Sequence, residues 1–273
     1  MLALLSVGAH GQEQPTEDEP VSPLDQTVPV ADEDDSAQAE NGPPEIVTED
    51  EMLAEFARFR QLLADQNFDE ADVSAKRVVE MTIKVFGPQS RETAKALNNL
   101  AIVQHNNRQY AAAIQNFTSA IEILEIVADR LNEELVNPLK GLGAAQLGEG
   151  RPDLAINSLG RATHITHVNE GPHNIEQVEI LESLAEAKVR LGDIEGARDA
   201  LDRIYALNVR FFKGDALGLL PSLMSRAEWQ HRAGYYNDER VTYRRAIRVI
   251  ETTVGKNDAR LVAPLMRLGQ SYY

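Results

Sequence analysis

The chain has 273 residues, no cysteine and a formal net charge of −16 at pH 7. Without cysteine it has no disulfide, no cysteine nucleophile and no lipid anchor through a cysteine. A nucleic-acid-binding protein needs a basic face, which this sequence lacks, and no run reaches the roughly 18 apolar residues of a membrane span.

The first eleven residues, MLALLSVGAHG, form a short apolar run that ends in small residues. Ala9 and Gly11 fit the site at which a secretory signal is cut, with Gln12 as the first residue of the mature protein. No basic residue precedes Leu2, so a hydrophobic N-terminus without a function is the alternative. We expect residues 1–11 to be a signal peptide, complete or lacking its start, and the protein to be periplasmic or secreted; the runner-up location is the cytoplasm.

Residues 12–50 differ in composition from the rest of the chain. They hold thirteen Asp or Glu, six of the twelve prolines and no Lys or Arg. Low hydrophobicity with high net charge cannot offset the entropy of an ordered chain, so this pattern predicts an acidic, disordered linker. Two roles fit it, a solvated spacer and an arm for a basic partner, and the spacer is the simpler interpretation.

From about residue 51 the sequence repeats itself with a period of 42. Five features keep this period: an alanine, two leucines, a small residue and a bulky residue. The alanine series is Ala71, Ala113, Ala155 and Ala197, and one leucine series is Leu97, Leu139, Leu181, Leu223 and Leu265. The bulky series is Phe68, Tyr110, Pro152, Ile194 and Tyr236. A shared period in several series predicts a stack of similar units rather than one globular core.

Within each unit the apolar residues have helical spacing. In residues 97–124 they recur at steps of three and four, interrupted once by a polar turn. Each unit is therefore predicted to be two amphipathic helices joined by a short turn, and neither helix can bury its apolar stripe alone. The expected units are 51–92, 93–134, 135–176, 177–218 and 219–260, with a partial unit at 261–273.

The repeat resembles the tetratricopeptide repeat, whose signature places a leucine, a small residue, an alanine and an aromatic or bulky residue at fixed offsets. The third unit carries it as Leu139, Leu142, Gly143, Ala155 and Leu159. The 42-residue length, with Gly87, Gly171 and Gly255 recurring 84 apart, is similar to the longer subtype found in kinesin light chains. The resemblance implies an all-α fold, a right-handed α-solenoid of antiparallel helix pairs (a TPR superhelix), preceded by a disordered N-terminal segment.

The stretch GLGAAQLGEG, residues 141–150, resembles a phosphate-binding loop. A dinucleotide fingerprint needs a third glycine, but Gln146 occupies that position. A P-loop ends in Gly-Lys-Ser/Thr, but this stretch ends in Gly148-Glu149-Gly150-Arg151, which places an acid where the phosphate would bind. The repeat offers the simpler interpretation. Gly143 is a close-packing position, and Gly148 and Gly150 lie near a turn between helices.

Three units depart from the pattern. In the first, Phe56, Phe59 and Leu63 suit a helix shifted by one residue, as expected of a terminal capping repeat. In the fifth, Arg226 and Glu239 occupy core positions, which predicts local loosening or a shifted helix. The last helix has a mostly apolar face up to Tyr273, whereas a terminal capping helix should show a polar face to water. We therefore expect the chain to continue beyond this residue.

In this family the first helix of each unit lines a concave groove, so its residues between the core leucines are candidates for partner binding. These candidates are Asn98, Asn99, Ile102, His105, Asn106, Lys140, Glu182, Glu186, Arg190, Glu228 and His231. The asparagines have amide donors and acceptors that suit a peptide backbone, or they are ordinary solvated surface. A clamp for a C-terminal carboxylate fits poorly, because only Lys140 and the asparagines suit it and Glu182 and Glu186 would repel the carboxylate. The mixed charges favour a peptide with basic and apolar character.

We find no catalytic constellation in the sequence. His164, His167 and His173 have a spacing that suits zinc, but also suits a solvated helix end, and no acidic second partner is identifiable. We therefore expect no enzyme activity, no metal and no cofactor. The predicted function is a scaffold whose partner is another protein or an extended peptide; the alternative is a regulatory arm of a larger enzyme or assembly factor.

Overall fold

The computed structural model describes residues 47–212 and 216–273. The predicted signal peptide and most of the predicted linker lie outside these ranges. The described residues form α-helices and short 3-10 helices and contain no β-strand. Five helix pairs and one further helix follow one another: α1 Glu49–Ala64 and α2 Phe68–Phe86, α3 Arg91–Asn106 and α4 Tyr110–Val127, α5 Val136–Gly148 and α6 Pro152–Glu170, α7 Gln177–Leu191 and α8 Ile194–Phe211, α9 Leu220–Arg232 and α10 Tyr236–Val254, and α11 Val262–Gln270.

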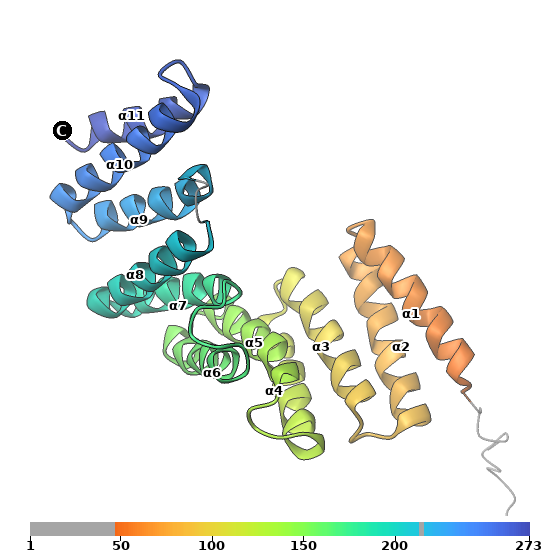
Figure 1. Ribbon diagram of the computed structural model, residues 1–273. Helices are drawn as coiled ribbons and strands as arrows, with labels where there is room; N and C mark the ends of the chain where they lie inside the picture. Colours follow the sequence, from red (N-terminus) through yellow and green to blue (C-terminus); the bar gives the residue numbers. More distant parts are fainter. Residues whose placement is uncertain (1–46, 213–215) are drawn as a thin grey trace, which may run out of the picture. The chain divides into compact units, whose positions relative to one another are not determined.

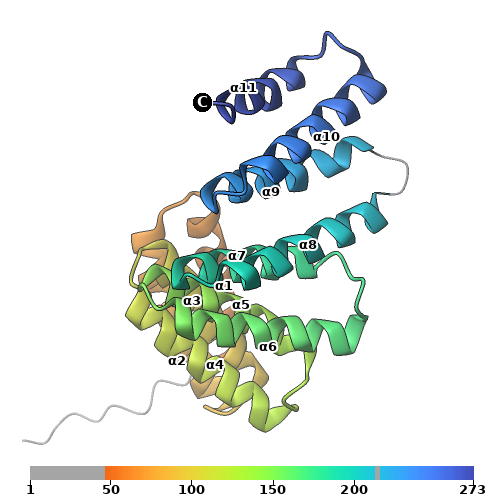
Figure 2. The same cartoon turned by 90° about the vertical axis from the view of Figure 1, so that its left-hand side faces the viewer.

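Each helix packs against the next one in the sequence. Contacts join the two helices of every pair, and they also join α2 to α3, α4 to α5 and α6 to α7 (Figure 1). The first helices of successive pairs touch as well, α3 with α5 and α5 with α7. In the turned view of Figure 2, α6, α8, α10 and α11 lie one above another. The predicted all-α solenoid is therefore confirmed.

The 42-residue period fixes where the second helix of each pair begins. The bulky series of the repeat supplies the first residue of all five: Phe68, Tyr110, Pro152, Ile194 and Tyr236. Two residues before each of these, the chain turns through a positive φ, at Gln66, Arg108, Gly150, Gly192 and Gly234. This left-handed conformation is unfavourable for residues with a side chain, which explains why glycine fills three of the five positions.

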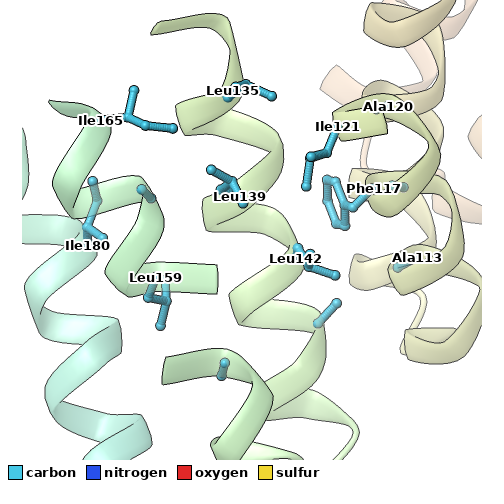
Figure 3. Close-up of a cluster of buried hydrophobic side chains, with 14 of the residues drawn as sticks. Ala113, Phe117, Ala120, Ile121, Leu135, Leu139, Leu142, Leu159, Ile165 and Ile180 are labelled. Atoms are coloured by element: carbon cyan, nitrogen blue, oxygen red, sulfur yellow. The ribbon is translucent and has the colours of Figure 1, made fainter. Parts of the chain in front are cut away.

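The core of each pair is built from the repeated alanine, leucine and bulky positions. All four repeated alanines are fully buried. Around α5, Leu139 and Leu142 lie between Phe117 and Ile121 of α4 on one side and Leu159 of α6 on the other (Figure 3). Burying one such side chain stabilises the fold by about 1.5–3 kcal/mol, and several of these side chains are buried between neighbouring pairs.

The glycines of residues 141–150 are packing and turn residues. A Cβ on Gly143 would lie 2.6 Å from Cγ of Leu159, and a Cβ on Gly141 or Gly148 would clash with the ring of Phe117 or Tyr110. Gly150 has a φ of +79° in the turn. The helices approach closely at these positions, which accounts for the glycines without a bound nucleotide.

A buried polar contact also repeats, which the sequence analysis missed. Asn116 donates to Gln104 Oε1 at 2.7 Å, and Ser158 donates to Gln146 Oε1 at 2.8 Å. In the fifth pair Thr242 donates to Gln230 Oε1 at 2.8 Å. Each bond joins the first helix of a pair to the second and pairs buried polar groups whose isolation would be unfavourable.

The first pair has the shifted register expected of it. Phe59 is buried, with Phe56 and Leu63 packed against the same cluster. Thr48 caps α1 and forms a reciprocal capping box with Glu51, which explains why the helix begins at Glu49.

The fifth pair does not show the expected shift. Its second helix begins at Tyr236, in step with the other pairs. Arg226 is accommodated because its guanidinium pairs with Asp202 at 2.6 Å and lies over the ring of Tyr205. Glu239 stays buried at the position of the repeated alanine. The polar residues are absorbed by local contacts rather than by moving the helix.

Candidate partner-binding site

The eleven candidate residues all lie on first helices of the pairs. Five are on α3, Lys140 is on α5, three are on α7, and Glu228 and His231 are on α9. Because α5 contacts both α3 and α7, the candidates on these three helices belong to neighbouring elements. Their side chains differ in what they contact.

On α3 the candidates form a mixed surface. Ile102 and Asn106 are exposed, and Asn98 and Asn99 are partly buried. The Oδ1 atom of Asn98 is buried and has no hydrogen-bond partner among the described residues. An unmet buried acceptor is unfavourable, so a hydrogen-bond donor that reached this oxygen would stabilise the protein.

His105 is packed rather than freely solvated. Its ring lies against Tyr110, with the centroids 5.5 Å apart, and its Nδ1 has no partner in the part of the chain that the structure describes. Burial lowers the pKa of the imidazole below its usual 6.5. His105 is therefore largely neutral at pH 7 and adds no positive charge to this face.

The start of α5, the end of α6 and the start of α7 enclose a pocket of about 790 Å³. Two of the candidates, Lys140 and Glu182, line it. Its other charged residues are glutamates from these elements and from the 3-10 helix Glu133–Leu135: Glu133, Glu134, Glu170, Glu176 and Glu179. Six glutamates against one lysine make the pocket strongly acidic, and we call it the acidic pocket.

Only part of this negative charge is balanced within the described residues. Lys140 pairs with Glu179, and Glu134 lies 3.5 Å from Nε of Arg91. The other four glutamates, at positions 133, 170, 176 and 182, have no ion-pair partner in residues 47–212 or 216–273. The acidic pocket can therefore receive a cationic group without displacing an internal one.

The pKa values of two pocket residues reflect this crowding of negative charge. Burial and the neighbouring Glu179 raise the pKa of Glu182, and burial together with Glu176 and Glu133 raises the pKa of Glu170. Each carboxylate is less favourable in its charged form than in water. A cation bound in the pocket would relieve that repulsion.

The remaining candidates on α7 pair with each other. Arg190 contacts Glu186 at 2.9 Å and also donates to the Leu147 carbonyl at 3.0 Å. Arg232 of α9 lies 3.9 Å from the same Glu186. Glu228 and His231 line a second pocket, between α9, α10 and α11. The structure thus distributes the candidates over the α3 surface, the acidic pocket, an ion-pair group and the second pocket.

Sequence reasoning missed most of the acidic pocket. Glu170 ends α6, Glu176 directly precedes α7, and Glu133 lies in a 3-10 helix, so none is at a first-helix groove position. The only signal in the sequence was the density of acids in LNEEL and VNEGPHNIEQVE. That density became meaningful only when the fold brought the two segments to one pocket.

The histidine cluster does not form a metal site in the structure. His164, His167 and His173 are exposed, and the described residues contain no group of three or more His, Asp or Glu arranged to hold a metal ion. Nor does any helix within the described ranges have the length and apolar character to cross a membrane.

Comparisons with known proteins agree with this architecture. Residues 60–126 match the family model described as tetratricopeptide repeat. This segment carries tetratricopeptide repeats. The kinesin light chain TPR-like repeats of Podosopora anserina superpose with a TM-score of 0.67 at 15% identity, covering 75% of this chain and 97% of that one. The predicted resemblance to kinesin light chain repeats is therefore confirmed at the level of the fold.

Two further similarities were found, one to a solved structure and one in sequence. A Rap protein complexed with competence and sporulation factor shares the fold with a TM-score of 0.54 at 16% identity, over 81% of this chain and 64% of that one. In sequence, 122 residues are 28% identical to the mitochondrial tetratricopeptide repeat protein 19 homolog of Drosophila melanogaster. That match covers 44% of this chain and 32% of the relative's length.

Proposed function

We propose that the tetratricopeptide repeats form a noncatalytic scaffold that binds a partner protein through an extended, basic segment held at the acidic pocket. The observation that carries this proposal is the acidic pocket itself, with six glutamates and one lysine around about 790 Å³. Stacked repeats offer continuous surfaces that suit extended ligands, and the pocket lies on two of the first helices that were expected to line the groove.

A lysine or arginine side chain is the ligand group that best fits the pocket. Four of its glutamates lack an internal cation among the described residues. An attraction between unit charges about 4 Å apart is worth about 4 kcal/mol at an effective dielectric constant near 20, before the cost of desolvation. Arginine would in addition make paired hydrogen bonds to a carboxylate.

The α3 surface supplies the contacts for the rest of such a segment. Ile102 is 40% exposed and can pack against an apolar side chain. The unmet Oδ1 of Asn98 marks an amide that a peptide backbone could satisfy. A Rap protein of the same fold has been solved with a factor bound, which supports ligand binding by this architecture in general.

The test is the binding of two fluorescent peptides of equal length, one alternating lysine with leucine and the other glutamate with leucine. We expect the basic peptide to bind, and its affinity to fall at least tenfold in the double variant Glu176→Lys, Glu182→Lys and with rising salt. Glu251→Lys on α10, an exposed residue outside the pocket, is the matched control and should leave binding unchanged. Equal binding of both peptides, or no effect of the double variant, would contradict the proposal.

Export is a separate part of the proposal and depends on Ala9 and Gly11 at the expected cleavage site. Mass spectrometry of the protein purified from its source should find Gln12 as the first residue. A chain that retains Met1 or Leu2 would contradict export by this signal.

A further inference from the structure

The second pocket lies in the fifth pair, between α9, α10 and α11, and encloses about 450 Å³. Residues of both charges line it: Glu228, His231, Glu239, Tyr243, Arg267 and Gln270. It is separate from the acidic pocket, and it has the size of a small-molecule site.

At this pocket, polar residues occupy two positions of the repeat that are apolar in the other pairs. The position of Glu239 is alanine in the four preceding pairs, at Ala71, Ala113, Ala155 and Ala197. The position of Tyr243 is occupied in those pairs by apolar residues: Ala75, Phe117, Leu159 and Leu201. Only the fifth pair has a carboxylate and a hydroxyl there, so the fold itself does not require these groups.

The carboxylate of Glu239 is buried and has one side-chain partner, His231, among the described residues. Glu239 is 2% exposed, and its Oε2 lies 3.1 Å from Nδ1 of His231, a ring that is itself half exposed. A buried carboxylate is unfavourable unless its charge and lone pairs are met. One histidine at the pocket wall meets only part of that requirement.

Tyr243 places a hydroxyl group in the wall of the same pocket. Tyr243 is 1% exposed and lines the pocket. Burial raises its pKa, and so do Glu239 and Glu228, whereas Arg267 lowers it. The side chain of Tyr243 therefore lies among the charged residues of the pocket.

Opposite charges face this pocket without pairing. Neither Glu228 nor Arg267 forms an ion pair in the part of the chain that the structure describes, although both line the same space. Arg232, which also lines it, reaches Glu186 at 3.9 Å. A ligand with only an amine would leave the positive charge of Arg267 unpaired, and a ligand with only an anionic group would be repelled by two glutamates. A ligand that carries both charges can pair with the arginine and with the glutamates.

We infer that this pocket binds a free α-amino acid, with the ammonium at Glu239, Glu228 and the Tyr243 hydroxyl, and the carboxylate at Arg267 with Gln270 beside it. The inference does not depend on the proposed peptide function, because no residue is shared between the two pockets. It gives the repeat domain a small-molecule ligand in addition to a protein partner.

The test begins with thermal shift measurements on the whole chain with each of the twenty L-amino acids, and continues with calorimetry on the best one. We expect at least one to raise the melting temperature. Tyr243→Phe, which keeps the ring, should weaken that affinity about fivefold to tenfold, as expected for one lost hydrogen bond. Glu239→Ala should weaken it more than tenfold, yet leave the unliganded protein at least as stable, because alanine occupies this position in the other four pairs.

Two modified ligands decide which charges matter. The N-acetyl form mimics a peptide C-terminus and the amide form mimics a peptide N-terminus, and both should bind at least tenfold more weakly than the free amino acid. Equal binding of either form would overturn the assignment of a zwitterion, and so would the absence of any shift in the panel or equal affinity in Glu239→Ala. The control Glu251→Gln, outside the pocket, should bind like the wild type.

The two proposals fail separately. The double variant Glu176→Lys, Glu182→Lys should still bind the amino acid, and Glu239→Ala should still bind the basic peptide.

Discussion

At the scale of single residues, the closest approach between helices depends on Gly143. An added Cβ would lie 2.6 Å from Leu159 Cγ, and Leu159 is buried and held by its neighbours. We expect Gly143→Ala to lower the free energy of unfolding by about 1–3 kcal/mol, the usual cost of overpacking a core. Urea unfolding of the two proteins measures the difference.

Gly160 is the matched control for that substitution. It lies inside α6, and a Cβ there would meet nothing within 4 Å. Gly160→Ala should therefore stabilise the protein by about 0.5–1 kcal/mol, because alanine loses less chain entropy in a helix. If both substitutions changed stability in the same direction, close packing at Gly143 would not be the reason for its glycine.

His105 makes stability depend on pH. Burial lowers the pKa of this imidazole in the folded protein, so the unfolded chain takes up the proton first as the pH falls below about 6.5. The contribution of neutral His105 is complete above that pH and is lost as the pH falls toward the folded pKa. We expect the free energy of unfolding to decrease from pH 7.5 to pH 5.5, and to decrease less in His105→Leu.

Leucine is chosen for that variant because Leu147 occupies the same position in the next pair. Urea unfolding at several pH values supplies the comparison. Identical pH slopes for the two proteins would mean that other groups cause the change.

At the scale of elements, the turn within each pair imposes a left-handed residue. Arg108 takes a φ of +59° where Gly150 takes +79° in the next pair. A left-handed residue with a side chain costs roughly 1–2 kcal/mol. We therefore expect Arg108→Gly to stabilise the protein by up to about 1 kcal/mol, after the entropy of the added glycine, and Gly150→Ala to destabilise it by about 1 kcal/mol.

Chemical denaturation of these two variants tests the turn. A loss of stability in Arg108→Gly would show that contacts of the arginine side chain outweigh its backbone strain.

The acidic pocket forms only where several elements pack together, because three helices and a 3-10 helix supply its residues. Raised pKa values at Glu182 and Glu170 mean that these carboxylates protonate at a higher pH than ordinary glutamates. We expect the affinity for the basic peptide to fall as the pH is lowered from 7 toward 5. Glu182→Gln should bind more weakly at pH 7 and show a flatter pH profile, measured by fluorescence anisotropy. An affinity that is constant over this range would contradict the role of these carboxylates.

The elements also show what the sequence could predict. The period of 42 located the starts of the second helices, from Phe68 to Tyr236, because each start is fixed by a local turn and a bulky residue. The acidic pocket was not predictable, because Glu133 and Glu170 are distant in sequence and meet only through the packing of α5 and α6. Glu239 was identified as a departure, but its bond to His231 required the structure.

At the scale of the whole described molecule, stability is distributed along the stack rather than gathered in one core. The largest buried cluster extends from α3 to α7, and smaller ones lie in the first pair with α3, in the fourth pair, and in the fifth pair. In such an array each pair is stabilised by its immediate neighbours, so a local defect should open a local segment first.

Leu139, 2% exposed in the largest cluster, allows that behaviour to be tested. Leu139→Ala should cost about 2–5 kcal/mol and speed amide hydrogen exchange in α4, α5 and α6 while changing α10 little. Leu223→Ala, in the cluster that contains Ala246 of α10, should give the opposite distribution. If either substitution accelerated exchange equally over all described helices, the repeats would unfold as one cooperative unit, and the neighbour-by-neighbour account of their stability would be wrong.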